Sequence, residues 1–270
     1  TGEAFTIDAP PPSALASRGR FAIMAVALMA LGGIITAVVL STSDREASPS
    51  PAASATTAAP QATNIPRERV ASFGALPKTL DDPDDPGTPA RVALGSVLFF
   101  DARLSRHEDV SCANCHQLDK YGVDGERFSR GTGGVLGERN TPTVFNIAGA
   151  SSFMWDGRAD SLVEQVSLPM LSEKEHGMSA EEIETRLRAI DGYKPLVEAA
   201  FDDRPAVSFA NVARAIAAFE RTLLTPAPWD DYQEGGEAAL SAAERAGFNA
   251  FVDAGCPTCH VGPYVGATMN

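Results

Sequence analysis

Two five-residue segments, 112–116 and 256–260, share the pattern Cys-x-x-Cys-His and together contain all four cysteines of the chain. In this pattern two thiols can form thioether bonds to one haem while the adjoining histidine binds its iron. A disulfide, a thioredoxin-like redox pair or half of a zinc site would use the same residue types. Because the whole pattern occurs twice and no cysteine is left over, we favour haem. The sequence therefore predicts two haem c groups, one on Cys112, Cys115 and His116 and one on Cys256, Cys259 and His260.

Helices are expected to position both motifs. Apolar residues recur at helical spacing from Pro89 onward, which predicts a helix ahead of the first motif. A further helix is expected from Ser208 to the region of Pro226. Three capping boxes predict three more helix starts: Ser161 with Glu164, Ser179 with Glu182, and Ser241 with Glu244. Gly255 is placed to end the last of these helices just before Cys256. Alternation typical of strands is nearly absent, so we predict a mainly α fold.

Residues 121–137 are dense in glycine and have no regular period, so we expect a long loop after the first motif. Long loops without regular structure in compact domains are usually functional. A phosphate-binding loop is excluded because no Lys-Ser/Thr pair follows the glycines. His107, among charged residues before the motif, is interpreted as a solvated loop residue rather than a ligand.

Residues 21–40 form an uncharged apolar run that is long enough to cross a bilayer of about 30 Å. Arg18 and Arg20 precede the run, and by the positive-inside bias they leave residues 1–20 in the cytoplasm. A cleaved signal peptide is the alternative, but the run is longer than the usual signal and no clean cleavage site follows. We therefore favour a retained anchor. Residues 41–70, rich in Ala, Ser, Thr and Pro, are predicted to be a disordered linker.

The chain has 270 residues and a formal net charge of -13, which argues against nucleic acid as a partner. Its length suits one or two domains. We expect an N-terminal haem domain at 71–225 and the start of a second haem domain at 226–270. The chain begins with Thr1 and ends ten residues after His260, so a truncated second domain and a fragment of a longer protein are expected.

Several blocks in the second part of the chain resemble the bacterial di-haem cytochrome c peroxidases. In order they are LGSVLFFDARLS with SCANCH, RNTPTVFN, WDGRA with SLVEQ, AIAAFERTL, ALSAAERAGFNAF and CPTCH. The resemblance runs from about Leu94 to the end and includes the related di-haem enzymes that mature methylamine dehydrogenase. It implies two cytochrome-c-like, mainly helical domains with one haem in each.

The resemblance also implies roles for single residues. The haem on Cys112 and Cys115 would be the peroxidatic one, and the haem on the second motif would be the site of electron entry. Trp155 would lie between the haems and couple them. Gln165 would line the peroxide pocket, Glu175 would move protons beside it, and Asn140 would bind a calcium ion.

Two features depart from the family pattern. Many members carry a loop histidine that binds the resting peroxidatic iron, and Thr132 stands at that position here. Our hypothesis is that the first haem is five-coordinate or water-bound at rest. His176 is the one spare candidate ligand of this iron, and we do not favour it as a ligand. Met269 follows His260 too closely to be a good distal ligand, so the distal ligand of the second haem is expected outside this chain.

The leading functional hypothesis is reduction of hydrogen peroxide to water with electrons from a small exported cytochrome c or cupredoxin. A di-haem oxidase that modifies a protein substrate is the runner-up, and a membrane-tethered electron carrier without substrate chemistry is the third hypothesis. Covalent haem attachment and the apolar run predict a periplasmic protein held at the inner membrane by residues 21–40. The donor, a homodimer and a calcium requirement are left open.

Overall fold

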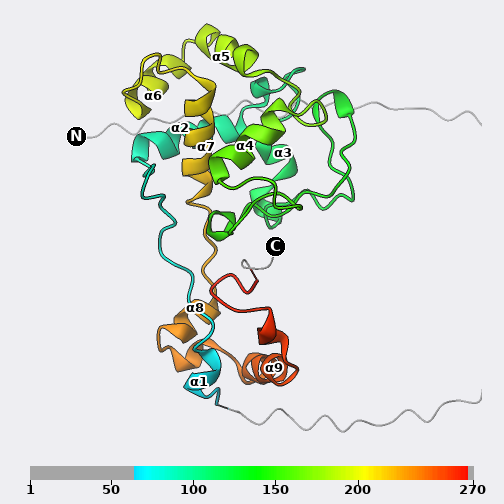
Figure 1. The fold of residues 1–270 in the computed structure, drawn as a ribbon, viewed down its shortest axis with the longest axis vertical. Helices are drawn as coiled ribbons and strands as arrows, with labels where there is room; N and C mark the ends of the chain where they lie inside the picture. The colour runs from blue at the N-terminus through cyan, green and yellow to red at the C-terminus, as the bar shows by residue number, and fades with distance from the viewer. Residues whose placement is uncertain (1–63, 267–270) are drawn as a thin grey trace, which may run out of the picture. The chain divides into compact units, whose positions relative to one another are not determined.

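The computed structural model describes residues 64–266, and helices provide almost all of their regular structure (Figure 1). The α-helices are α1 (Arg67–Val70), α2 (Pro89–Phe100), α3 (Cys112–Cys115), α4 (Leu162–Leu171), α5 (Ala180–Ala189), α6 (Tyr193–Ala200), α7 (Phe209–Glu220), α8 (Pro228–Gln233) and α9 (Ala242–Asp253). Short 3-10 helices are η1 (Ala102–Leu104), η2 (Leu118–Lys120), η3 (Thr132–Gly134), η4 (Ile147–Gly149), η5 (Glu237–Ala239) and η6 (Cys256–Thr258). Within this range the β-structure consists of two isolated bridges, so the mainly α prediction is confirmed.

The apolar run 21–40, the segment before it and Met269 lie outside the described residues. Between residues 64 and 266, the structure contains no helix that is both long and apolar enough to cross a membrane.

The predicted capping residues do start helices. The hydroxyls of Ser179 and Ser241 each accept a hydrogen bond from the backbone N–H three residues on. The carboxylate of the glutamate at that position accepts a bond from the backbone N–H of the capping serine. Ser161 accepts from Glu164 N at 3.1 Å, but the Glu164 carboxylate turns to Asp160 N instead of Ser161 N. Gly255, at φ +79°, follows the end of α9 as predicted. The helix from Ser208 ends at Glu220, well before Pro226, because its last turn closes on Arg221.

The crossing of α2 and α7 organises the larger hydrophobic core, and α7 also packs against α4 (Figure 1). A Cβ atom on Gly95 would lie 1.9 Å from the carbonyl oxygen of Ala215, so the two helices can approach this closely only because residue 95 is glycine. Around the crossing, the side chains of Leu98, Phe99 and Ile216 are almost completely buried. The helical turn of the first Cys-x-x-Cys-His motif packs against α2, one of the two crossing helices.

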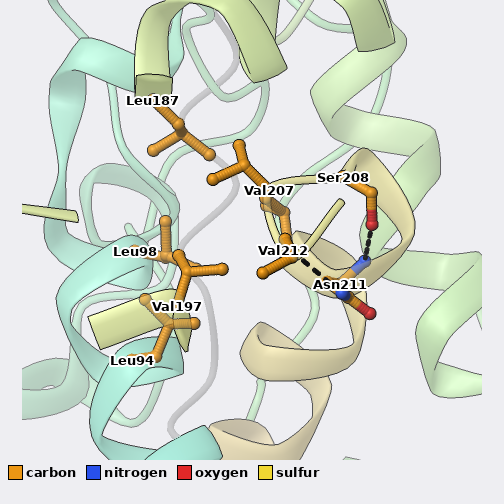
Figure 2. Close-up of a pocket in the computed structure, with 9 residues that line it drawn as sticks. Leu94, Leu98, Leu187, Val197, Val207, Ser208, Asn211 and Val212 are labelled. Atoms are coloured by element: carbon orange, nitrogen blue, oxygen red, sulfur yellow. Dashed lines mark hydrogen bonds between the residues drawn. The ribbon is translucent and has the colours of Figure 1, made fainter. Parts of the chain in front are cut away.

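A recess beside this crossing is shown in Figure 2. It is lined mainly by aliphatic side chains of α2, α5, α6 and α7, and it has no room for a water molecule. Its polar members bond to their own segment: Asn211 N donates to Ser208 Oγ at 3.2 Å, and Asn211 Nδ2 donates to Ala206 O at 3.0 Å. The recess is part of the core packing and contains no group suited to catalysis.

A second, smaller hydrophobic cluster contains the buried residues Ile65, Val70, Tyr232 and Leu240. Phe73 adds to it by edge contacts with the rings of Trp229 and Phe248. Residues 64–74 therefore pack with the segment that carries the second motif. The predicted linker 41–70 is wrong at its C-terminal end, and the predicted domain boundary at 71 separates residues that pack together. Helix α1 has four residues and is too short to show a periodic pattern of apolar residues, so its sequence could not be distinguished from that of the linker.

Candidate haem sites

The first Cys-x-x-Cys-His motif starts with the single helical turn α3. Ser111 caps this turn, and its backbone N–H donates to Asn114 Oδ1 at 2.8 Å. Cys112 and Cys115 are three residues apart on the turn and therefore lie on the same side of it. Both are free thiols. Two thiols on one side of a turn fit attachment to a single haem.

His116 ends the turn, with its backbone N–H bonded to Cys112 O at 2.8 Å. Its Nδ1 lies 3.3 Å from Gly122 O, a contact that suits an Nδ1–H donor and leaves Nε2 for an iron atom. Burial lowers the pKa of His116, which keeps the ring in the neutral form that binds metal. Gly122 has φ +72°, and a Cβ there would lie 2.9 Å from Thr143 Oγ1, so glycine is required to present this carbonyl.

Two features of the described residues fit a covalently held haem: the thiols are desolvated, and a buried guanidinium keeps one nitrogen without a partner. Burial is the main cause of the raised pKa of both Cys112 and Cys115. Arg221, at the end of α7, is buried and binds Asp82 through Nη2 at 3.0 Å. Its Nη1 has no partner among residues 64–266, and such a nitrogen fits a carboxylate like those of the haem propionates. The thiols, the imidazole and this guanidinium are therefore chemically suited to haem c.

Glu175 acts electrostatically on this motif, while its predicted catalytic role stays a prediction. Its charge contributes to the raised pKa of both Cys112 and Cys115. Its own pKa is raised by desolvation, against the lowering effects of a hydrogen bond with Ser172 and the charge of Arg158. The residue has accessible surface overall, yet its carboxylate is surrounded closely enough for desolvation to dominate. A carboxyl group in this condition can exchange a proton closer to neutral pH than an ordinary glutamate.

His176, next to Glu175, is held firmly by the core. The ring is buried, and Nδ1 lies 2.8 Å from Leu104 O. Its backbone carbonyl accepts from Arg106 N at 2.8 Å, and its backbone N–H donates to Pro169 O at 3.1 Å. Burial lowers its pKa, so the ring is neutral at pH 7. These bonds give His176 a role in packing that does not depend on iron.

Gln165 and Trp155 lie on neighbouring elements of the first domain. Gln165 is half-buried on α4, and its Nε2 lies 3.9 Å from Met154 Sδ. Trp155 belongs to a tight reversal closed by the bridge between Phe153 and Ala159. Its ring is 56% exposed and is oriented by the bond from Nε1 to Asn140 O at 2.9 Å. The roles predicted for these two residues stay predictions.

Asn140 therefore has a contact that the sequence did not suggest, because its backbone carbonyl orients Trp155. No group of three or more His, Cys, Asp or Glu side chains gathers as a metal site in the part of the chain that the structure describes. The calcium role of Asn140 stays a prediction.

The second motif repeats the backbone arrangement of the first. η6 begins at Cys256, and His260 N donates to Cys256 O at 3.0 Å. His260 Nδ1 lies 3.0 Å from Val265 O, which again suits an Nδ1–H donor and leaves Nε2 for iron. Cys256 is half-buried and Cys259 is exposed. The ring of Phe251 lies 6.1 Å from that of His260, so α9 supports the histidine directly.

Glu220 is a buried acid that the sequence reasoning missed. It is the last residue of α7, is 6% exposed, and its Oε2 has no partner among the described residues. Burial raises its pKa to about 8. Its charge also contributes to the raised pKa of Cys112, so it lies near the first motif. The available signal was the pair Glu220-Arg221 interrupting the apolar helix end AIAAFERTL.

A sequence profile described as di-haem cytochrome c peroxidase matches residues 89–238, which is more than half of the chain. The chain is 43% identical over 178 residues to the methylamine utilization protein MauG of Methylorubrum extorquens, covering 65% of this chain and 50% of that protein. It is 42% identical over 176 residues to a cytochrome c551 peroxidase of Pseudomonas aeruginosa, covering 64% and 51% respectively. The chain thus spans about half the length of the curated relatives that it matches.

Among solved structures, the chain is similar to a MauG-like protein associated with microbial copper homeostasis. The TM-score is 0.63 at 28% sequence identity, and the match covers 77% of this chain and 61% of the other. The similarity therefore includes most of the helical frame of the described residues.

Proposed function

Since the chain belongs to the di-haem cytochrome c peroxidase family, whose cofactors are two covalently bound haem c groups, we propose that it reduces hydrogen peroxide to water. Two electrons and two protons are consumed for each peroxide, and the proposed donor is a small exported cytochrome c or cupredoxin. The observation that supports peroxide chemistry at the first motif is the position of Glu175. Its carboxylate acts electrostatically on both cysteines of this motif, and desolvation of the carboxylate raises its pKa although the residue as a whole is exposed.

The haem iron, when present, binds peroxide and exchanges electrons with it. Glu175 would accept a proton from one oxygen of peroxide and return it to the other oxygen, which leaves as water. Desolvation raises the pKa of Glu175, which favours a carboxyl group that both accepts and releases a proton in the reaction. Gln165, on α4, would orient the peroxide by hydrogen bonding.

His116 would hold the first haem iron through Nε2, since its Nδ1 lies 3.3 Å from Gly122 O and suits an Nδ1–H donor. Trp155 would couple the two haems, with its indole oriented by Asn140 O. His260 would hold the second haem, where electrons enter. Asn140 would bind calcium as well.

Thr132 stands where many relatives of this kind carry a histidine ligand. Its side chain is buried, and its hydroxyl donates to Asp109 Oδ1 at 2.7 Å. Threonine has no side-chain nitrogen that could bind the iron, and its hydroxyl is bonded to Asp109 here. We therefore propose that the first haem is high-spin, five-coordinate or water-bound, at rest and reacts without prior reduction. An oxidised sample with only low-spin, six-coordinate haem would contradict this.

A second candidate function is the oxidation of side chains in a protein substrate. The 43% identity to a MauG protein favours it, since this is as high as the identity to a peroxidase. Both functions use peroxide and the same first haem. They differ in the source of the electrons, which is a protein substrate in one and a small redox protein in the other.

The proposed location is the periplasm, where c-type haem attachment is expected, with residues 21–40 as an inner-membrane anchor. Protease protection of the full chain in spheroplasts tests the location.

The test of function is stopped-flow mixing of the full chain, loaded with both haems, with peroxide and reduced cytochrome c. Oxidation of cytochrome c that depends on peroxide supports the peroxidase. Consumption of peroxide without cytochrome oxidation favours the protein-modifying oxidase. If neither reagent is consumed, the proposal fails, and the electron carrier and the protein-modifying branch are the functions left.

A further inference from the structure

We propose that Asp109 is a positioning residue for Glu175, and that it acts through residues 131–133 of the glycine-rich loop. The inference rests on the proposed function, because it assigns a role toward the peroxide reaction. Asp109 precedes the first motif and is 66 positions away from Glu175 in the sequence. The contacts between them form a continuous chain of hydrogen bonds.

The first link joins Asp109 to the loop. Oδ1 accepts from the hydroxyl of Thr132 at 2.7 Å, and Oδ2 accepts from Gly133 N at 2.7 Å. Both carboxylate oxygens are therefore used by two consecutive loop residues. The same two bonds are the main cause of the lowered pKa of Asp109, so the group is an anion at neutral pH. Hydrogen bonds to an ionised acceptor are stronger than neutral ones.

The second link consists of one bond within the segment 105–109, which carries Asp109, and one bond from this segment to the loop. Asp109 N donates to Ser105 Oγ at 3.1 Å, and Ser105 is completely buried. The Thr132 hydroxyl, besides donating to Asp109, accepts from His107 N at 3.1 Å. Thr132 is thus held from two sides, and its hydroxyl has both a donor and an acceptor partner.

The third link joins the loop to Glu175. Thr132 N donates to Glu175 O at 2.7 Å, and Glu175 N donates to Ser172 O at 3.0 Å. Both backbone polar groups of Glu175 are therefore fixed. A Cβ on Gly131 would lie 2.0 Å from Lys174 O and 2.7 Å from Glu175 Cα, so the loop lies directly against this segment. Movement of residues 131–133 cannot occur without movement of Glu175.

A second connection between the same loop and the same segment provides a matched control. Glu138 forms an ion pair with Lys174, but their side chains are 78% and 52% exposed. Ion pairs between exposed side chains contribute little to the stability of a fold. If any tie between the loop and residues 172–177 were sufficient, loss of this pair would have the same effect as loss of the Asp109 bonds. We expect it to have almost none.

The experiment compares the wild-type chain with Asp109→Ala, Asp109→Asn, Thr132→Val and Glu138→Gln, all loaded with haem. Hydrogen exchange is measured first, because it needs no activity. Asp109→Ala should speed exchange at residues 172–177 as well as at 131–137. Asp109→Asn keeps one acceptor oxygen, and Thr132→Val loses the hydroxyl bonds to Asp109 and His107 N but keeps the bond from Gly133 N to Asp109. Both variants should give smaller changes than Asp109→Ala. Glu138→Gln should match the wild type.

The second readout is the pH dependence of the bimolecular reaction with peroxide. In the wild type, the rate should fall below the raised pKa of Glu175, since the carboxylate must accept a proton. Of the groups around Glu175, Arg158 bears the charge that acts on it, and His176 is neutral. In Asp109→Ala the site should admit more water, which weakens the desolvation that raises the pKa of Glu175. The fall in rate on acidification should therefore begin at a lower pH than in the wild type. Misplacement of the acid–base group should also slow the reaction about tenfold or more near pH 7.

The inference is overturned if Asp109→Ala leaves exchange at 172–177 unchanged while 131–137 is released. It is also overturned if the variant reacts with peroxide at the wild-type rate and with the wild-type pH dependence. Should Asp109→Ala fail to fold, Thr132→Val carries the same two comparisons. If the wild-type chain does not react with peroxide but the exchange results are as expected, the proposed function fails and the positioning of Glu175 by Asp109 stands.

Discussion

Replacement of Glu220 by glutamine should change how the stability of the protein depends on pH. Glu220 is buried at the end of α7, and burial raises its pKa from 4.5 to about 8. The folded protein therefore holds the Glu220 proton more tightly than the unfolded chain does. Stability from this group is complete below pH 4.5 and is lost as the pH rises to about 8.

The shift of about 3.5 pKa units corresponds to about 5 kcal/mol at 1.36 kcal/mol per unit. Glutamine has nearly the same shape and does not ionise. The free energy of unfolding of Glu220→Gln should therefore exceed that of the wild type by an amount that grows by about 1.4 kcal/mol per pH unit between pH 5 and 8. At pH 4.5 the two proteins should be nearly equal.

Guanidinium unfolding of the haem-loaded proteins at pH 5, 6, 7 and 8 measures this difference. The control is Glu198→Gln on α6, where the side chain is exposed and should give a curve parallel to the wild type. If the curves of Glu220→Gln and the wild type are also parallel over this range, Glu220 is ionised without cost. The reasoning from its burial would then be refuted.

Three further predictions follow from single contacts. Glu175→Gln should slow the reaction with peroxide by about 10²-fold or more while the ferric haem spectrum stays unchanged, as stopped-flow absorbance will show, and an unaltered rate would exclude Glu175 as the acid–base group. Gly122→Ala should displace the carbonyl that bonds to His116 Nδ1 and lower the iron–histidine stretching frequency of the reduced first haem in resonance Raman spectra; the same frequency would mean that this bond does not tune the ligand. Gly95→Ala should destabilise the fold by about 1–3 kcal/mol or more because of the clash with Ala215 O, whereas Gly247→Ala, on α9 with open space around it, should stabilise by about 0.5–1 kcal/mol; equal thermal midpoints would contradict the close crossing.

Much of the helical frame could be predicted from the sequence because its signals are local. A serine followed three residues later by glutamate defines a helix start within one turn, and Ser179 and Ser241 behave in this way. The haem-attaching residues are equally local, since both thiols and the histidine lie within five positions. Glu175 was identified only through resemblance, and the structure brings it near Cys112 and Cys115.

The features that the sequence could not show depend on long-range contacts. Asp109 looks like an ordinary loop acid, and only the fold brings Thr132 and Gly133 to its carboxylate. The packing of Ile65 and Val70 against Tyr232 joins segments more than 160 residues apart. Contacts at such separations leave no periodic pattern in a single sequence, and the boundary of the linker was misplaced for this reason.

The most direct test of the account is the oxidation of a reduced small cytochrome c by peroxide in the presence of the full chain with both haems attached. The account predicts steady turnover at neutral pH without prior reduction of the enzyme, with two electrons used per peroxide, and loss of nearly all turnover in Glu175→Gln. No peroxide-dependent oxidation by the wild type, or equal turnover by the variant, would contradict it.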